Sequence, residues 1–249
     1  MKKITFLFIL VSISLLSFAQ LNVGGHFAYN STWLMNKQVF DAGAEMDVAA
    51  SFGSSFGIIA GYYFSDQFGL ETNINFNKLK QNYEGSIKYF FTLEDERNAY
   101  NSTTVLNTLD IPVLMKFGKN TYFELGPMLQ FVNKATYSRT FDETDVLKPG
   151  IYHGMAYSFA NREDIAVKSN FKNVGIGVAF GFGANFNIIE DALKLNFGVR
   201  FNYILTDMQG INGLGERKDS NFVTADEKDN FKTNPLYGGL KIGLVYIFE

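Results

Sequence analysis

Hydrolysis is the first chemistry to consider, because it needs only a nucleophile and a base. The chain has two histidines, His26 and His153, and no cysteine. Neither histidine lies near a Gly-x-Ser-x-Gly segment or a comparable signature that pairs a nucleophile with its base. We therefore expect no catalytic residue. A lipid-modifying enzyme, such as a lipase or acyltransferase, is the least favoured of three functional hypotheses.

Metal and cofactor sites are weakly indicated as well. Zinc–thiolate sites are excluded because the chain lacks cysteine. The glycine-rich run 175–183 lacks the G-x-G-x-x-G spacing of a dinucleotide site, since Phe180 occupies the third glycine position. Two acidic groups lack the spacing of an EF-hand: Asp142, Glu143 and Asp145, and Asp226, Glu227 and Asp229. We expect neither a metal nor a cofactor, and interpret these acids as solvated charge.

Electrostatic pairing is the chemistry that the residue pattern supports best. Seven charged residues fall on the polar side of segments in which apolar and polar residues alternate: Glu71, Asp110, Lys116, Glu124, Lys194, Arg200 and Lys241. Facing one another in the narrow interior of a small barrel, opposite charges would pair and neutralise each other. We predict that they form a structural charge network, with His26 as a packed neighbour. Gating of a small-solute channel is the alternative role.

Eight segments show this alternation and are expected to be β-strands. In the clearest one, Leu70, Ile74 and Phe76 point to one side, while Glu71 and Asn73 point to the other. The segments are residues 21–30, 56–64, 69–78, 105–117, 122–131, 174–183, 193–206 and 237–248. Glycines of the 175–183 run take one side of their strand, where small residues relieve crowding inside a narrow barrel.

The lengths and connections of these segments predict the fold. About ten residues cross a bilayer as a tilted strand, and an even number of strands can close without leaving an edge. Connections 65–67, 118–121 and 188–192 are short, whereas 33–55, 79–103, 132–173 and 207–234 are long and polar. We predict an all-β, eight-stranded antiparallel up-and-down transmembrane β-barrel with four long extracellular loops and short periplasmic turns. Both termini would then be periplasmic.

A soluble barrel or sandwich is the main alternative fold, because its strands also alternate but turn their apolar side inward. The sequence does not reveal which side is inside. The charges and asparagines on the polar side favour the membrane barrel, since paired charges suit its filled interior.

Aromatic residues are abundant, with 26 Phe and 13 Tyr. A girdle at the short-turn ends is expected from Phe64, Phe68, Phe117, Tyr122, Tyr246 and Phe248. The long connections carry further aromatic residues: Trp33, Phe40, Tyr89, Phe90, Phe91, Tyr152, Tyr157 and Phe159. These either bind a partner or ligand, or pack the loops themselves.

The N-terminus predicts export. Lys2 and Lys3 precede an apolar run, and Ser17-Phe18-Ala19 resembles a cleavage site, so residues 1–19 are expected to be a signal peptide and residues 20–249 the barrel domain. An uncleaved N-terminal helix is the alternative. Without Lys2 and Lys3, 22 − 2 = 20 basic residues face 25 acidic ones, a formal charge of −5. This charge argues against nucleic acid as a partner.

Three segments resemble the PorT-like outer-membrane β-barrel family: "LDIPVLMKF" at 109–117, the aromatic-x-x-Gly-Pro segment at 122–127, and the glycine-rich strand at 175–183. The resemblance implies an outer-membrane barrel, and some relatives are linked to a gliding and protein-secretion machinery. It also implies insertion by the barrel-assembly machinery, which reads the last strand. Such strands commonly end on an aromatic residue, whereas here Phe248 is penultimate and Glu249 is last.

Pro112 and Pro127 lie within predicted strands. Proline cannot donate to a sheet ladder, so we predict a bulge or local irregularity near each.

Taken with the chemistry above, the sequence predicts a non-enzymatic integral outer-membrane protein in contact with membrane lipid. Its role would be structural, binding or accessory to secretion, with an envelope or secretion-system protein as a candidate partner. A small-solute outer-membrane channel is the alternative function.

Overall fold

The computed structural model describes residues 20–65, 67–90, 96–144, 149–152, 154–190, 192–217 and 232–248. The predicted signal peptide lies outside these residues. Eight long strands make up the fold: β1 (Gln20–Asn36), β3 (Phe52–Tyr63), β4 (Phe68–Tyr89), β5 (Arg97–Phe117), β6 (Thr121–Phe141), β10 (Val174–Ile189), β11 (Leu193–Ile204) and β12 (Thr233–Phe248). Within the described residues, no helix is long and apolar enough to cross a membrane.

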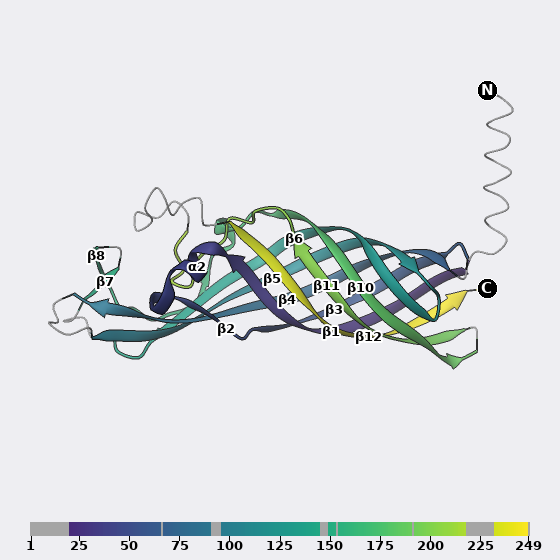
Figure 1. The fold of residues 1–249 in the computed structure, drawn as a ribbon, viewed down its shortest axis with the longest axis horizontal. Helices are drawn as coiled ribbons and strands as arrows, with labels where there is room; N and C mark the ends of the chain where they lie inside the picture. Colours follow the sequence, from purple (N-terminus) through teal and green to yellow (C-terminus); the bar gives the residue numbers. More distant parts are fainter. Residues whose placement is uncertain are drawn as a thin grey trace, which may run out of the picture.

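The strands close into a ring. Their order is β3-β1-β12-β11-β10-β6-β5-β4, and a further antiparallel pairing joins β3 to β4. Each strand therefore pairs with the long strands that precede and follow it in the chain, and β1 pairs with β12 along its length (Figure 1). The predicted eight-stranded antiparallel up-and-down barrel is confirmed.

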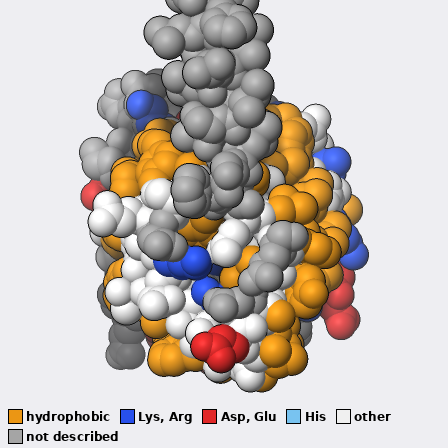
Figure 2. Space-filling view, turned by 90° about the vertical axis from the view of Figure 1, so that its right-hand side faces the viewer, with side chains coloured by type: hydrophobic (Ala, Val, Ile, Leu, Met, Phe, Trp, Pro, Cys, Tyr) orange, Lys and Arg blue, Asp and Glu red, His pale blue; other side chains and the backbone are white. Residues whose placement is uncertain are grey.

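The polar side of each strand faces the barrel interior. Glu71 is 3% exposed and Asn73 1%, whereas Phe56 and Ile58 on the outer wall are 60% and 59% exposed. A soluble barrel would have the opposite arrangement, because its apolar side chains would fill the core. Figure 2 shows hydrophobic side chains around the short-turn end and Lys or Arg side chains nearer its middle. The fold is therefore a transmembrane barrel.

Aromatic rings line the outer wall at the short-turn end. Ring contacts run from Phe64 to Phe68 at 5.6 Å between centroids, from Phe68 to Phe117 at 5.7 Å, and on to Phe123 at 6.4 Å. Tyr246 and Phe248 contact each other at 4.9 Å. The girdle prediction was wrong for Tyr122, which is 4% exposed and points into the lumen. Its position in the alternation puts it on the same side as Glu124.

The strands continue far beyond the expected membrane span. β4 has 22 residues, and β5 and β6 have 21 each, about twice the number that crosses a bilayer. Segments 79–103 and 132–173, predicted as loops, are therefore partly strand. In these continuations the alternation keeps its period but reverses its polarity. Lys78 and Lys80 point outward from β4, while Leu79 and Tyr83 are buried.

We call the part of the molecule beyond this reversal the loop-side extension (Figure 1). It contains α2 (Lys37–Asp41), η1 (Gly43–Glu45), β2 (Asp47–Ala49), β7 (Gly150–Tyr152), β8 (Met155–Tyr157), β9 (Arg162–Ala166) and η2 (Lys168–Asn170). β2 and β7 pair with β4, β8 with β7, and β9 with β6. Apolar side chains from these elements and from the ends of β4, β5 and β6 form a second core. It includes Val39, Met46, Tyr83, Ile87, Tyr100, Phe141, Tyr152, Tyr157 and Leu214.

Near the two prolines the ladder shows a local irregularity, which is one of the two predicted outcomes, and no bulge. Pro127 pairs with Val178 in an unshifted register. Beside Pro112, ladder pairs drop out without a register shift: pairing with β6 passes from Pro112↔Met128 to Met115↔Leu125. The skipped positions are Val113 and Leu114, opposite Pro127 and Gly126, so a local irregularity lies near both prolines as predicted. The register shift between β5 and β6 lies elsewhere, at Asn107/Thr108. A proline lacks the backbone N–H, and this interrupts a few hydrogen bonds of the ladder. A bulge is not needed, because no extra residue has to be inserted into the strand.

Candidate functional site

The charged side chains of the lumen meet in one ion-paired cluster near the short-turn end. Lys116 Nζ lies 2.7 Å from Glu71 Oε2, and Arg200 Nη2 lies 3.3 Å from Glu71 Oε1. Arg200 Nε donates to Glu124 Oε1 at 2.5 Å, and Lys241 Nζ lies 3.6 Å from the same oxygen. These five residues come from β4, β5, β6, β11 and β12, so the cluster connects strands that are not neighbours in the barrel.

Of the other two predicted network members, Asp110 lies at a different level of the lumen and Lys194 borders the cluster. Asp110 instead accepts hydrogen bonds from the Tyr237 hydroxyl and, at 3.4 Å, from Gln130 Nε2. Lys194 lines a small cavity at the short-turn mouth together with Glu71 and Lys116. Asp110 is therefore separate from the ion-paired cluster, whereas Lys194 lies next to it. The reason is height along the strand: Asp110 lies six residues before Lys116 on β5, which places it in a different layer of the lumen.

Small residues make room for the cluster. A Cβ atom on Gly181 would lie 2.8 Å from Glu124 Oε1 and 2.6 Å from the Val199 carbonyl oxygen. Gly181 belongs to the glycine-rich run and faces the lumen, as the sequence predicted. His26 is also buried in the lumen, whereas His153 lies outside the described residues.

Toward the loop side, apolar side chains fill most of the lumen, and Asp110 is buried beside them, bonded to Tyr237 of the same apolar cluster. Leu79, Leu106, Leu114, Met128 and Ile204 are each at most 2% exposed and belong to one buried cluster. Residues 207–217 help to cover this layer. The hydroxyls of Ser102 and Tyr137 both donate to the Gly213 carbonyl oxygen, the second at 3.1 Å. Along the barrel axis, the ion-paired cluster is thus followed by a mainly apolar layer that contains Asp110.

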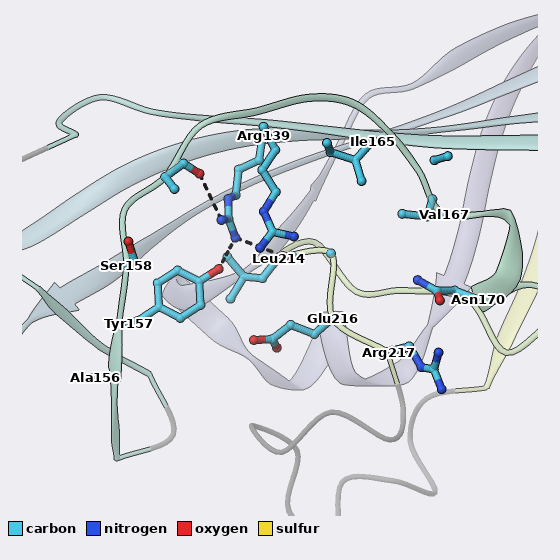
Figure 3. A pocket seen from close by; sticks show the side chains of 14 residues that line it. Arg139, Ala156, Tyr157, Ser158, Ile165, Val167, Asn170, Leu214, Glu216 and Arg217 are labelled. Atoms are coloured by element: carbon cyan, nitrogen blue, oxygen red, sulfur yellow. Dashed lines mark hydrogen bonds between the residues drawn. The ribbon is translucent and has the colours of Figure 1, made fainter. Parts of the chain in front are cut away.

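A cleft of about 890 Å³ opens in the loop-side extension (Figure 3). Its walls come from β6, the stretch around β8, β9 and η2, and the segment after β11. The lining residues include Arg139, Tyr157, Arg162, Val167, Asn170 and Leu214. We call it the loop-side cleft. Its size is in the range of small-ligand pockets.

Arg139 is the most constrained side chain of the cleft. It is 3% exposed, and its guanidinium donates to the Tyr157 hydroxyl, to Leu214 O at 3.1 Å and to Ala160 O at 3.1 Å. Figure 3 shows it reaching between Tyr157 and Leu214. Burial raises the pKa of the Tyr157 hydroxyl above its ordinary value, although the charge of Arg139 opposes this. The tyrosine therefore stays neutral when it accepts this bond.

This cleft was not predicted from the sequence. Of the loop aromatics, Tyr89, Tyr152, Tyr157 and Phe159 are at most 8% exposed, and Tyr157 also lines the cleft. They pack the core of the extension, which was the alternative. Trp33 belongs to β1, Phe40 and Phe90 are exposed, and Phe91 lies outside the described residues. The reversed alternation in 79–89 is the signal that could have predicted the extension.

No group of three or more metal-ligating side chains occurs within the described part of the chain. The acidic groups at 142–145 and 226–229 are only partly described, because Asp145 and residues 226–229 lie outside it. The geometry is thus that of a filled barrel with an ordered extension, which defines the class of integral β-barrel membrane proteins.

Comparisons with known proteins agree with this class. Residues 18–210 match the model of the family described as "Outer membrane protein beta-barrel domain", and the chain belongs to this family. No curated protein matches the chain. The protein is therefore an outer-membrane β-barrel protein.

Several solved structures are similar to the chain at low identity. Neisserial surface protein A (NspA) is 15% identical, with 92% of this chain and 97% of that one covered and a TM-score of 0.37. OprG from Pseudomonas aeruginosa is 11% identical, with 93% and 97% covered and a TM-score of 0.39. A major outer membrane protein from Thermus thermophilus is 14% identical, with 92% and 99% covered and a TM-score of 0.43.

Proposed function

We propose that this protein is a non-enzymatic, closed outer-membrane scaffold whose loop-side extension binds a partner outside the cell. The observation that carries the proposal is the filling of the lumen. The ion-paired cluster around Arg200 and the apolar layer around Leu106 and Met128 occupy successive levels of the barrel. The interior of an eight-stranded barrel is narrow, and here side chains fill it. The function is therefore expected at the loop side and not in the lumen.

The orientation is part of the proposal. Short turns connect the strands at the girdle end and long connections at the other, which favours an extracellular extension and periplasmic termini. The resemblance to PorT-like barrels favours an accessory role in an envelope or secretion system. Insertion by the barrel-assembly machinery through β12, contact with outer-membrane lipid, and the absence of nucleic acid among the partners belong to the same proposal.

Ion conductance tests the closed lumen. The purified protein in planar bilayers should give no sustained conductance steps, because charged and apolar side chains fill the lumen. Sustained steps would contradict the scaffold and support the small-solute channel.

Site-specific cross-linking tests the binding face. A photo-reactive residue would be placed at Phe90 or Phe40, which are 41% and 51% exposed in the extension. Phe76 on the lipid-facing wall is the matched control. We expect one defined protein adduct from the extension positions in whole cells and none from Phe76. Identical adduct patterns at all three positions would contradict a binding role of the extension.

A further inference from the structure

The loop-side cleft contains a buried positive charge whose partners are all neutral. Arg139 donates to one hydroxyl and two carbonyl oxygens, which occupy three of the five N–H groups of a guanidinium. Its Nε is buried and has no hydrogen-bond partner. Among the described residues, no carboxylate forms an ion pair with Arg139. Burying a cation without an opposite charge is costly.

A second arginine lies beside the first. Arg162 on β9 is the ladder partner of Arg139 on β6, and both line the cleft. Arg162 is exposed, and within the described residues it forms no ion pair either. Two guanidinium groups on neighbouring strands provide a fork of donors that fits a phosphate or carboxylate.

The acidic residues near this pair do not neutralise it at ion-pair distance. Glu216 lies in the cleft wall, where its Oε2 accepts from Asn212 Nδ2 at 3.2 Å. Glu163 and Asp164 border a second hollow that Arg139 and Arg162 also line. Asp164 is turned toward Ser138, whose hydroxyl lies 3.4 Å from its Oδ1. Aromatic rings give Arg139 partial compensation: Phe141 at 4.8 Å and Tyr157 at 5.3 Å from its guanidinium carbon.

Apolar side chains line part of the cleft next to this pair, and Ser158, Asn170, Glu216 and Arg217 line other parts. Ile165 and Val167 stand on one wall, and Leu214 on the other (Figure 3). Such a lining favours a ligand with an apolar part over a bare inorganic ion, because burying apolar surface adds to the affinity.

We propose that the loop-side cleft binds a small amphipathic anion, with its phosphate or carboxylate group between Arg139 and Arg162 and its apolar part along Ile165, Val167 and Leu214. This inference names a ligand class for the extension, and so rests on the proposed binding role of that face. It does not require the protein partner.

Binding of three matched probes to the purified, detergent-solubilised full chain tests the site by ligand-observed NMR titration. Phenyl phosphate carries both features, inorganic phosphate only the charge, and benzyl alcohol only the apolar ring. We expect saturable binding of phenyl phosphate, at least tenfold tighter than that of either other probe. Equal affinity for inorganic phosphate would overturn the amphipathic ligand, and equal affinity for benzyl alcohol would overturn the role of the arginines.

Two variants assign the binding to the cleft. Arg162→Gln removes the exposed partner of the pair without touching the buried contacts of Arg139, and should weaken phenyl phosphate binding at least tenfold. Lys168→Gln removes an exposed charge that does not line the cleft, and should change nothing. Unchanged affinity in Arg162→Gln, or an equal loss in both variants, would overturn the site.

This result is separable from the cross-linking result. Loss of phenyl phosphate binding in Arg162→Gln with no cross-link at Phe90 or Phe40 would leave the cleft intact and remove the protein partner. A cross-link at Phe90 or Phe40 without phenyl phosphate binding would support the protein partner and overturn the ligand site in the cleft.

Discussion

Arg200 Nε donates to Glu124 Oε1 at 2.5 Å across two strands that are not neighbours, since β10 lies between β11 and β6. The same guanidinium reaches Glu71 on β4 through Nη2 at 3.3 Å. Arg200 is 5% exposed and Glu124 is 1% exposed, so water solvates these two charges only slightly. Arg200 is therefore the member of the cluster that connects opposite sides of the barrel.

Removing this cation should destabilise the barrel. Arg200→Ala leaves Glu71 and Glu124 buried with fewer opposite charges, and we expect a loss of about 3–5 kcal/mol in unfolding free energy, as for other broken buried pairs. The measurement is the temperature at which the folded, faster-migrating form disappears on a denaturing gel. Lys78→Ala, on the outer face of β4, is the control. An unchanged transition in Arg200→Ala would show that the cluster does not stabilise the fold.

A side chain at Gly181 should disturb the same cluster from the neighbouring strand. Its Cβ would lie 2.6 Å from the Val199 carbonyl oxygen, and backbone cannot move as easily as a side chain. We expect Gly181→Ala to cost about 1–3 kcal/mol, the range for overpacked sites. At Gly25 the nearest atom to a Cβ is 3.6 Å away, an ordinary contact, so Gly25→Ala serves as the control. Equal gel transition temperatures for the two variants would contradict the packing argument.

The core of the extension should unfold without the barrel. Tyr100 is 1% exposed, donates to Glu45 O at 2.8 Å, and contacts Phe141 at 5.6 Å between ring centroids. Truncation of a buried aromatic residue typically costs about 3–5 kcal/mol. Tyr100→Ala should therefore make the extension sensitive to limited proteolysis while the heat-modifiable barrel fragment survives. Asn101→Ala, one residue along on the exposed face, should stay resistant. Loss of the barrel band in Tyr100→Ala would mean that the two parts fold as one unit.

The polarity reversal on β4 should mark the membrane boundary. The chain has no cysteine, so a single introduced thiol is a unique label. In reconstituted vesicles, a water-soluble maleimide should label Lys78→Cys and not Phe76→Cys, because the apolar outer wall ends between them. Equal labelling of both would place the boundary elsewhere.

The same reagent tests the orientation in whole cells. Glu84→Cys in the extension should be labelled, whereas Gln67→Cys at a short turn should be protected until the outer membrane is opened. The opposite pattern would invert the proposed topology.

The sequence by itself predicted the strands and the closed ring, because these follow from a period of two and from the need to pair every backbone group in a membrane. It favoured charges that face inward, but only the burial of Glu71 and its neighbours in the structure decided which side is inside. The sequence also identified Glu71, Lys116, Glu124, Arg200 and Lys241 as lumen residues, since each falls on the polar side of its strand. Alternation alone does not give the position of a residue along the barrel axis, so Asp110 was assigned to the same network although it lies at another level of the lumen.

The tertiary structure decided what happens beyond the bilayer. In residues 79–89 the alternation is as regular as in 69–78, but the apolar side chains are buried and the polar ones face outward. This is the arrangement expected of a strand surrounded by water. In the sequence, an alternation of reversed polarity that contains many charged residues resembles a polar loop. For this reason the strands of the loop-side extension were not predicted. The pair Arg139 and Arg162 was also beyond the sequence, because only the pairing of β9 with β6 brings two arginines 23 positions apart to one wall of a cleft.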